Sequence, residues 1–334
     1  MRCSAAASKG VLKHCVAALA LLALTPGCVA SASPENLPAK SAQPQDIVIA
    51  GSRVFPESVA TDAVGNIYIG SIAGAIYRAA PGAVEAVQWI AADETNGLRS
   101  VFGVLADETH GMLWVCSNPN PFKQPRETGP SALKAFDLAT GALSASYGFP
   151  QGEPTACNDI AVAADGTVFV SETASGRIFT LARGARNLAL FAQEKALVGV
   201  DGIAFADDGT LYINNVRENL FQRVNRKADG SYAGLTTLAL DDTLSGPDGL
   251  RPVGGNRFLQ AEGPAGRVAL ITVNGDSASV TPVRTGLDAS AGVARAGEVG
   301  YATEGKINYL IDPALRDKDP GTFMLRAFAL PEGL

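Results

Sequence analysis

Three carboxylates and one amide stand at equivalent points of a repeated phrase, and together they could hold a hard cation. The phrase consists of an apolar strand, a tight Asp, Asn or Gly turn and a second apolar strand, which predicts a β-hairpin. Its clear copies are Glu57–Tyr68, Asn158–Phe169 and Asp201–Tyr212, and looser copies begin at Phe102, Asp248 and Ala291. Four of these six opening positions carry oxygen-bearing side chains: Glu57, Asn158, Asp201 and Asp248.

The spacing of the copies predicts how these side chains are brought together. Successive openings are 43 to 56 residues apart, a period typical of radial repeat folds. In a propeller the first strand of each unit lines the central channel, so the opening residues should form a ring at one mouth. A ring of three carboxylates and one amide oxygen, without nitrogen or sulfur ligands, favours Ca²⁺ or Mg²⁺. Carboxylates this close would repel one another and raise one another's pKa unless a cation lay between them.

A simpler interpretation exists for each residue taken alone. Asp and Asn commonly begin strands because their side chains bond to nearby backbone groups. Four such residues at one register of a closed repeat favour the cation site instead.

The predicted fold is all-β: a six-bladed β-propeller with four-stranded antiparallel blades over residues 47–331. The expected third strands are 75–78, 132–137, 177–181, 220–224, 267–271 and 307–311. Ile47–Ala50 and Phe323–Leu330 are spare strands at the two ends, and either or both could complete the last blade.

Residues at the ends of the second strands should face the same mouth. They are polar and include Ser71, Ser117, Glu172, Asn215, Glu262 and Glu304. We expect Asn158, Glu172, Asn215 and Glu262 to contact substrate, although each of the rim residues alone is also typical of a solvated strand end. The proline-rich loop 116–131 leaves the second hairpin on this face, where it either shapes the entrance or is a tolerated insertion.

Composition excludes several classes of function. The one histidine outside the first 32 residues is His110, in the turn of the second hairpin, which points away from the openings. Zinc sites, histidine facial triads and Ser-His-Asp catalysis are therefore nearly excluded. Without those 32 residues the net charge moves from −6 to −9, because three basic residues are lost. An acidic chain without a basic cluster argues against nucleic acid as a partner.

The N-terminus has the layout of an export signal. Arg2, Lys9 and Lys13 precede an apolar run that is too short to span a membrane, followed by small residues. We expect residues 1–32 to be a signal peptide, residues 33–46 a disordered linker, and the protein to be periplasmic or secreted. Cleavage before Ser33 would release a soluble chain; Cys28 in a lipobox-like phrase would instead carry a lipid anchor.

Two cysteines remain in the predicted propeller. Cys116 ends the second strand of the second blade, and Cys157 immediately precedes Asn158 in the third. Adjacent blades and a common face favour a disulfide in an oxidising compartment. Two buried free thiols are the alternative.

At these residues the chain resembles the gluconolactonase/regucalcin family of six-bladed propellers. The matching motifs are Phe-Pro-Glu57-Ser-Val-Ala, Cys-Asn158-Asp-Ile-Ala-Val, Asp201-Gly-Ile-Ala-Phe and Gly-Pro-Asp248-Gly-Leu. The resemblance implies a divalent cation, usually Ca²⁺, held by Glu57, Asp201 and Asp248, with Asn158 contacting substrate or metal. This chain departs from the family at Asp201, where asparagine is usual, and at Ala156, where sugar-lactone members can carry arginine.

The expected function is metal-dependent hydrolysis of lactones or related esters. A cation at the axis (Ca²⁺, or Mg²⁺, Mn²⁺ or Zn²⁺) would polarise the carbonyl, and Asp248 would handle the water as the catalytic residue. The alternative is a non-catalytic propeller that binds a ligand or partner and uses Ca²⁺ structurally. We expect a monomer acting on a small molecule.

Overall fold

The computed structural model describes residues 44–151 and 154–334. The predicted signal peptide (1–32) and residues 33–43 of the predicted linker lie outside the described residues. At the end of that linker, the Asp46 carboxylate accepts hydrogen bonds from Arg326 Nη1 and from the Ala327 amide, both at 2.8 Å. No helix of the described part of the chain is long and apolar enough to cross a membrane.

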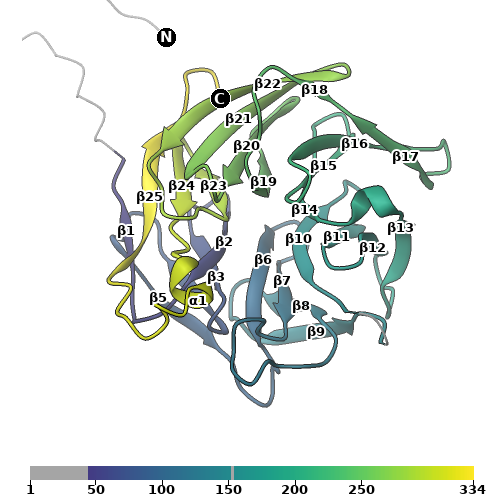
Figure 1. The fold of residues 1–334 in the computed structure, drawn as a ribbon. Helices are drawn as coiled ribbons and strands as arrows, with labels where there is room; N and C mark the ends of the chain where they lie inside the picture. The colour runs from purple at the N-terminus through teal and green to yellow at the C-terminus, as the bar shows by residue number, and fades with distance from the viewer. Residues whose placement is uncertain (1–43, 152–153) are drawn as a thin grey trace, which may run out of the picture. The chain divides into compact units, whose positions relative to one another are not determined.

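The architecture is all-β, as predicted, and most of its strands lie in antiparallel sheets (Figure 1). Three four-stranded sheets are formed by consecutive strands: β6 (Ser100–Asp107), β7 (Met112–Asn118), β8 (Ala132–Asp137) and β9 (Leu143–Gly148); β10 (Cys157–Val162), β11 (Val168–Glu172), β12 (Arg177–Leu181) and β13 (Ala189–Gln193); and β14 (Val200–Phe205), β15 (Leu211–Asn215), β16 (Leu220–Arg226) and β17 (Tyr232–Thr237). A short 3₁₀ helix, Lys195–Leu197, precedes β14.

Two larger sheets complete the described chain. One contains β19 (Pro247–Pro252), β20 (Arg257–Glu262), β21 (Arg267–Asn274) and β22 (Ser277–Thr285), with β18 (Ala239–Leu240) added in parallel beside β22. The other has the order β2 (Pro56–Thr61), β3 (Ile67–Ser71), β4 (Ala75–Ala79), β5 (Glu85–Ala91), β1 (Ile47–Ile49), β25 (Phe323–Ala329), β24 (Val299–Thr303) and β23 (Val293–Ala296). Both spare strands are used, because β1 pairs antiparallel with β25 and parallel with β5.

The first strand of each repeat is an edge strand that faces a common centre (Figure 1). These six strands contact one another in the cyclic order β2, β6, β10, β14, β19, β23 and back to β2. The sheets are therefore arranged radially around an axis, as in a propeller.

Glycine next to the opening residue lets these strands approach closely. A Cβ added at Gly202 would lie 2.5 Å from the main-chain oxygen of Asp248, and one added at Gly292 would lie 2.8 Å from that of Glu57. Any larger side chain would push neighbouring strands apart at the point where the opening residues meet.

Each of the first five repeats also has an irregular register at its opening. The shifts fall between Pro56 and Ser58, Val101 and Val104, Cys157 and Ile160, Val200 and Ile203, and Pro247 and Leu250. A bulge bends the strand and re-aims its side chains, so the opening residues need not follow the in-and-out alternation of the rest of the strand.

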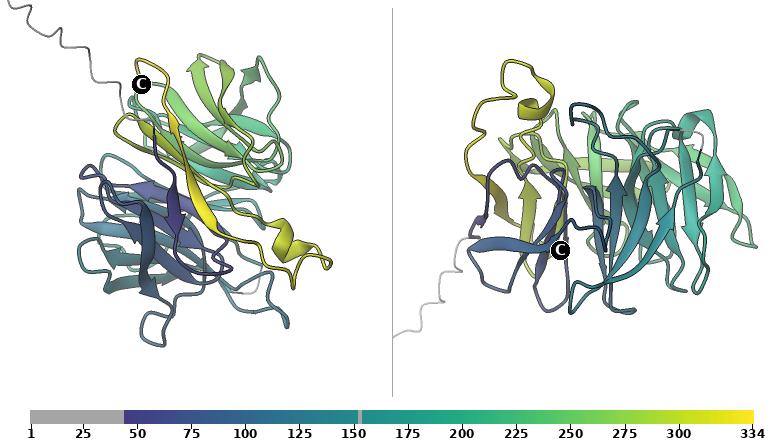
Figure 2. Two further views of the ribbon diagram at one scale, coloured as in Figure 1. Left: turned by 90° about the vertical axis from the view of Figure 1, so that its left-hand side faces the viewer. Right: turned by 90° about the horizontal axis from the view of Figure 1, so that it is seen from below.

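One predicted strand is wrong. Residues 307–311, expected as the third strand of the last repeat, form the short helix α1 (Asn308–Ile311), and β25 takes the strand position instead. Lys306, with a φ of 47°, turns the chain away after β24, and Ile307, Tyr309 and Leu310 pack onto the core cluster around Phe55 and Phe323. The segment that contains α1 extends beyond the strand ends in both views of Figure 2.

Candidate functional site

The opening residues of all six repeats line one pocket of about 740 Å³. They are Glu57, Phe102, Asn158, Asp201, Asp248 and Ala291. The convergence expected from the repeat is thus present, and it follows from the cyclic packing of the first strands and the bulges at their openings. Asn158, Asp201 and Asp248 are consecutive in this ring, whereas Glu57 stands between Phe102 and Ala291, which contribute apolar surface.

Burial and mutual repulsion act on all three carboxyl groups. Burial, followed by the charges of Asp248 and Asp159, raises the pKa of Glu57 well above its ordinary value. Burial, with the charges of Asp248 and Glu57, likewise raises the pKa of Asp201. Burial is also the main cause that raises the pKa of Asp248, to about 7. The cluster therefore cannot carry three negative charges near neutral pH without a proton or a cation between them.

Hydrogen bonds fix part of this cluster and leave the rest open. Asn158 Nδ2 donates to Asp201 Oδ2 at 2.8 Å and to Thr173 Oγ1 at 2.9 Å. Asp201 Oδ1 is buried and receives no hydrogen bond from a nitrogen or hydroxyl donor of the described residues. The side chains of Asp201 and Asp248 also interact with each other.

A buried ion pair lies directly behind the cluster. Arg251 Nη1 binds Asp159 Oδ2 at 2.8 Å and Oδ1 at 2.9 Å, while Arg251 Nη2 reaches Val104 O at 3.1 Å and Ser58 Oγ at 3.3 Å. These contacts join the first strands of four repeats across the axis. The positive charge of Arg251 also lowers the pKa of Glu57 and Asp248, against the larger effect of burial. The ion pair was not predicted from the sequence, although Asp159 directly follows Asn158 and Arg251 is three residues after Asp248.

The residue types suit a hard cation, although no closed coordination shell is present. In the described part of the chain, no three His, Cys, Asp or Glu side chains form a ready metal cluster. A cation would nevertheless give a partner to the buried Asp201 Oδ1 and would offset the repulsion between the neighbouring carboxyl groups. The donor set, three carboxylates and one amide, fits Ca²⁺ or Mg²⁺ better than softer ions.

Three of the residues expected to contact substrate lie away from the pocket. Glu172, Asn215 and Glu262 are fully buried, and none of them lines it. Glu172 accepts hydrogen bonds from the amides of Ala156 and Ala174, and Asn215 accepts from those of Arg217 and Glu218. Their polar groups hold the turns that follow the second strands, which accounts for the polarity read from the sequence.

A spacing in the sequence could have indicated this structural role. Glu172 precedes Arg177 by five residues, and Glu262 precedes Arg267 by the same interval. Both pairs form ion pairs across a turn, at 2.8 Å and 3.2 Å. A glutamate that meets an arginine inside its own sheet is not free to bind substrate.

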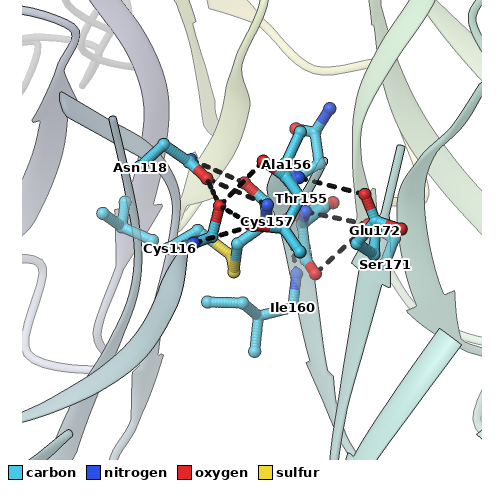
Figure 3. The surroundings of a disulfide bond; sticks show 12 residues. Cys116, Asn118, Thr155, Ala156, Cys157, Ile160, Ser171 and Glu172 are labelled. Atoms are coloured by element: carbon cyan, nitrogen blue, oxygen red, sulfur yellow. Dashed lines mark hydrogen bonds between the residues drawn. A yellow bond between two sulfur atoms is a disulfide. The ribbon is translucent and has the colours of Figure 1, made fainter. Parts of the chain in front are cut away.

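The two cysteines join neighbouring sheets (Figure 3), and Cys157 immediately precedes Asn158 in the sequence. Cys116 at the end of β7 and Cys157 at the start of β10 form a disulfide with a Cα–Cα distance of 5.2 Å. Asn118 reinforces the junction: its Oδ1 accepts from the Cys157 amide at 3.0 Å, and its Nδ2 donates to the Cys157 carbonyl at 2.8 Å. The disulfide and the two hydrogen bonds of Asn118 therefore fix the backbone of Cys157, the residue immediately before Asn158.

Comparisons with known proteins agree with the fold. A family profile described as "Strictosidine synthase-like, N-terminal" matches residues 45–79. A comparison with curated protein sequences gives no match.

Solved structures match over most of the chain. The Malassezia sympodialis allergen Mala s 1 is 16% identical with a TM-score of 0.67, covering 88% of this chain and 98% of that one. A luciferin-regenerating enzyme is 14% identical with a TM-score of 0.62, covering 86% and 96%. A Xanthomonas campestris gluconolactonase is 14% identical with a TM-score of 0.61, covering 85% and 89%. At these identities the likeness establishes the fold alone, and the chain folds as a β-propeller.

Proposed function

We propose that this protein is a six-bladed propeller that hydrolyses a lactone or related ester at a divalent cation site on its axis. Division of the eight-stranded sheet between β5 and β1 gives two four-stranded blades and six in all, with β1 and β25 completing the last. The observation that carries the proposal is the convergence of Glu57, Asn158, Asp201 and Asp248 on one pocket. The resemblance of the corresponding motifs to the gluconolactonase family supports the choice of reaction.

The cation would be held by those four side chains, with Ca²⁺ as the first candidate and Mg²⁺, Mn²⁺ or Zn²⁺ as alternatives. When bound, it would supply Lewis-acid polarisation of the substrate carbonyl and stabilisation of the developing oxyanion.

The side-chain nitrogen of Asn158 donates hydrogen bonds to Asp201 and Thr173. The rotation of Asn158 is thereby fixed, and its amide oxygen accepts no hydrogen bond from the described residues.

Asp248 is the residue best placed to move a proton. Burial raises the pKa of Asp248 to about 7 in the cation-free cluster, and a bound cation would lower that pKa while making the attacking water more acidic. Asp248 accepts a proton from water as the water oxygen bonds to the carbonyl carbon. The bond from that carbon to the ring or ester oxygen then breaks, and this oxygen takes the proton held by Asp248 as it leaves. The carboxylic acid formed releases its own proton to solvent, so the products are a carboxylate and an alcohol, which for a lactone belong to one hydroxy acid.

A panel of lactones and esters, assayed with each cation and with chelator, tests the reaction. We expect cation-dependent turnover that Asp248→Asn removes. Asp288→Asn is a matched control, because Asp288 is an exposed residue at the same pocket and the substitution makes the same change of charge. Cation binding without turnover of any substrate would instead favour a non-catalytic propeller with a structural ion.

The cellular context belongs to the same proposal. Residues 1–32 would direct export and be removed, which would place a monomeric protein in the periplasm or outside the cell; lipidation at Cys28 is the alternative fate. The Cys116–Cys157 disulfide supports an oxidising compartment. Mass spectrometry of the mature protein tests this, because cleavage before Ser33 and lipidated Cys28 give different masses.

A further inference from the structure

The pocket combines an acidic floor with an apolar wall. Its apolar lining includes Ile72, Phe102, Phe122, Leu287, Ile307 and Ile311. None of the described residues that line it is Lys, Arg or His. The wall therefore offers contact area but no cationic hydrogen-bond donor, whereas the floor offers concentrated negative charge.

One part of this wall is the loop between β7 and β8, and hydrogen bonds hold it in place. Asn120 Nδ2 donates to Ile72 O at 3.2 Å, and its Oδ1 accepts from the Phe122 amide at 2.9 Å. The main-chain amide of Asn120 donates to Glu127 Oε2 at 2.9 Å, and Glu127 forms an ion pair with Lys123 at 2.6 Å. Phe122 is thus presented by a structured loop, with its ring packed against the core cluster that contains Phe55.

The other part is the α1 segment, which comes from the far end of the chain. Arg53 donates to Tyr309 O at 3.3 Å and to Lys318 O at 3.1 Å. Lys306 Nζ donates to Pro320 O at 2.7 Å and to Thr322 O at 2.9 Å. These bonds fix the segment from both of its ends. Ile311 keeps 52% of its surface exposed while lining the pocket, so its apolar side chain is available to a ligand.

We infer that the substrate is a lactone or ester that carries an alkyl or aryl substituent, and not a polyhydroxylated sugar lactone. This inference rests on the proposed hydrolysis and specifies its substrate class. The carbonyl group would lie at the acidic floor, and the substituent would lie against the wall formed by Phe122, Ile307 and Ile311. A pocket of about 740 Å³ has the size of a small-molecule site. The side chains of Phe122, Ile307 and Ile311 cannot replace the hydrogen bonds to water that sugar hydroxyl groups would lose against them, which is unfavourable; the polar side chains of the lining outside the floor are Asp288, Ser290 and Asn308.

The first test is a series of γ-lactones with alkyl substituents of increasing length, compared with an aldonolactone. We expect kcat/KM to rise about fourfold for each added methylene until the wall is covered. Ile311→Ser and Phe122→Ser should flatten this rise, and Ile311 is the safer variant because it is half exposed. Val87→Ser is the matched control: Val87 is 53% exposed on β5, does not line the pocket, and should leave the slope unchanged.

The second test measures binding without turnover. Cyclic ketones with the same alkyl series cannot be hydrolysed, and calorimetry should give affinities that rise with chain length and fall about tenfold in Ile311→Ser. Chain-length-dependent ketone binding without hydrolysis of any lactone would uphold the apolar pocket and refute the proposed reaction. Faster hydrolysis of the aldonolactone than of every alkyl lactone would overturn the inference and leave the hydrolase standing. Ketone affinity independent of chain length, or equal in Ile311→Ser and Val87→Ser, would also overturn it.

Discussion

Replacing Asp248 by asparagine should stabilise the cation-free protein at neutral and alkaline pH. Asparagine has nearly the same shape but carries no charge, and its amide group can donate to the unpartnered Asp201 Oδ1. The substitution removes one of three carboxyl groups that repel one another in a buried cluster.

The size and sign follow from the shift of the Asp248 pKa. Burial raises it from an ordinary 3.8 to about 7, so between these pH values the folded protein holds a proton that the unfolded chain has released. Stability must then fall as pH rises through this window, by about 1.4 kcal/mol per pH unit and about 4 kcal/mol in total. Below the unfolded pKa this cost is absent, and above pH 7 it is complete. The asparagine variant lacks this site's contribution at every pH.

Urea denaturation in the presence of chelator at pH 5 and pH 8 measures the effect. The variant should exceed the wild type by about 1 to 2 kcal/mol at pH 5 and by about 4 kcal/mol at pH 8, equivalent to about 7 °C in Tm for a chain of this size. Saturating Ca²⁺ should reduce the variant's advantage by about 2.7 kcal/mol or more, because the wild type is expected to bind the ion at least a hundredfold more tightly. A variant less stable than the wild type at pH 8 with chelator would refute the electrostatic account of the cluster.

Three further outcomes are expected. Cys116→Ser with Cys157→Ser should lower the unfolding free energy by about 4 kcal/mol, since the disulfide closes a loop with a sequence separation of 41; an unchanged urea midpoint would contradict this. Arg251→Met leaves Asp159 as an uncompensated buried charge and should cost about 3 to 5 kcal/mol, and addition of Asp159→Asn should restore part of the loss; equal stabilities of the single and double variants would count against the ion pair. The calcium affinity should weaken about tenfold for each pH unit well below 7, because protons compete for the same carboxylates; an affinity independent of pH between 5 and 7 would exclude these groups as ligands.

The sequence predicted the convergence of the opening residues because repetition is a geometric constraint. A side chain at one register of a closed ring must meet its equivalents, so Glu57, Asn158, Asp201 and Asp248 could be assigned to one pocket without coordinates. Departures from the repeat could not be placed in this way. Residues 307–311 have a strand-like composition, and only their packing against the rest of the domain makes them a helix over the pocket.

The sequence did not reveal whether a polar side chain at a strand end points into the pocket or toward its own sheet. Glu172, Asn215 and Glu262 stand at the mouth in register, yet none faces the pocket. Glu172 and Asn215 accept amide hydrogen bonds from the turns that follow them, and Glu262 accepts one from Ser245, ahead of β19. A residue at a strand end can face a pocket or its own turn, and the choice depends on local donors that periodicity does not reveal. The apolar wall was not predicted for a related reason, since Phe122 comes from the loop between β7 and β8, and Ile307 and Ile311 come from the segment that was expected to be a strand.

Calorimetric titration with Ca²⁺ at pH 7.5 tests the central claim most directly, with the wild type, Asp248→Asn and Asp288→Asn compared side by side. We expect one bound ion in the wild type, the same affinity in Asp288→Asn, and at least a hundredfold weaker binding in Asp248→Asn. Equal binding in Asp248→Asn and the wild type, or no binding of Ca²⁺, Mg²⁺, Mn²⁺ or Zn²⁺ by the wild type, would contradict it.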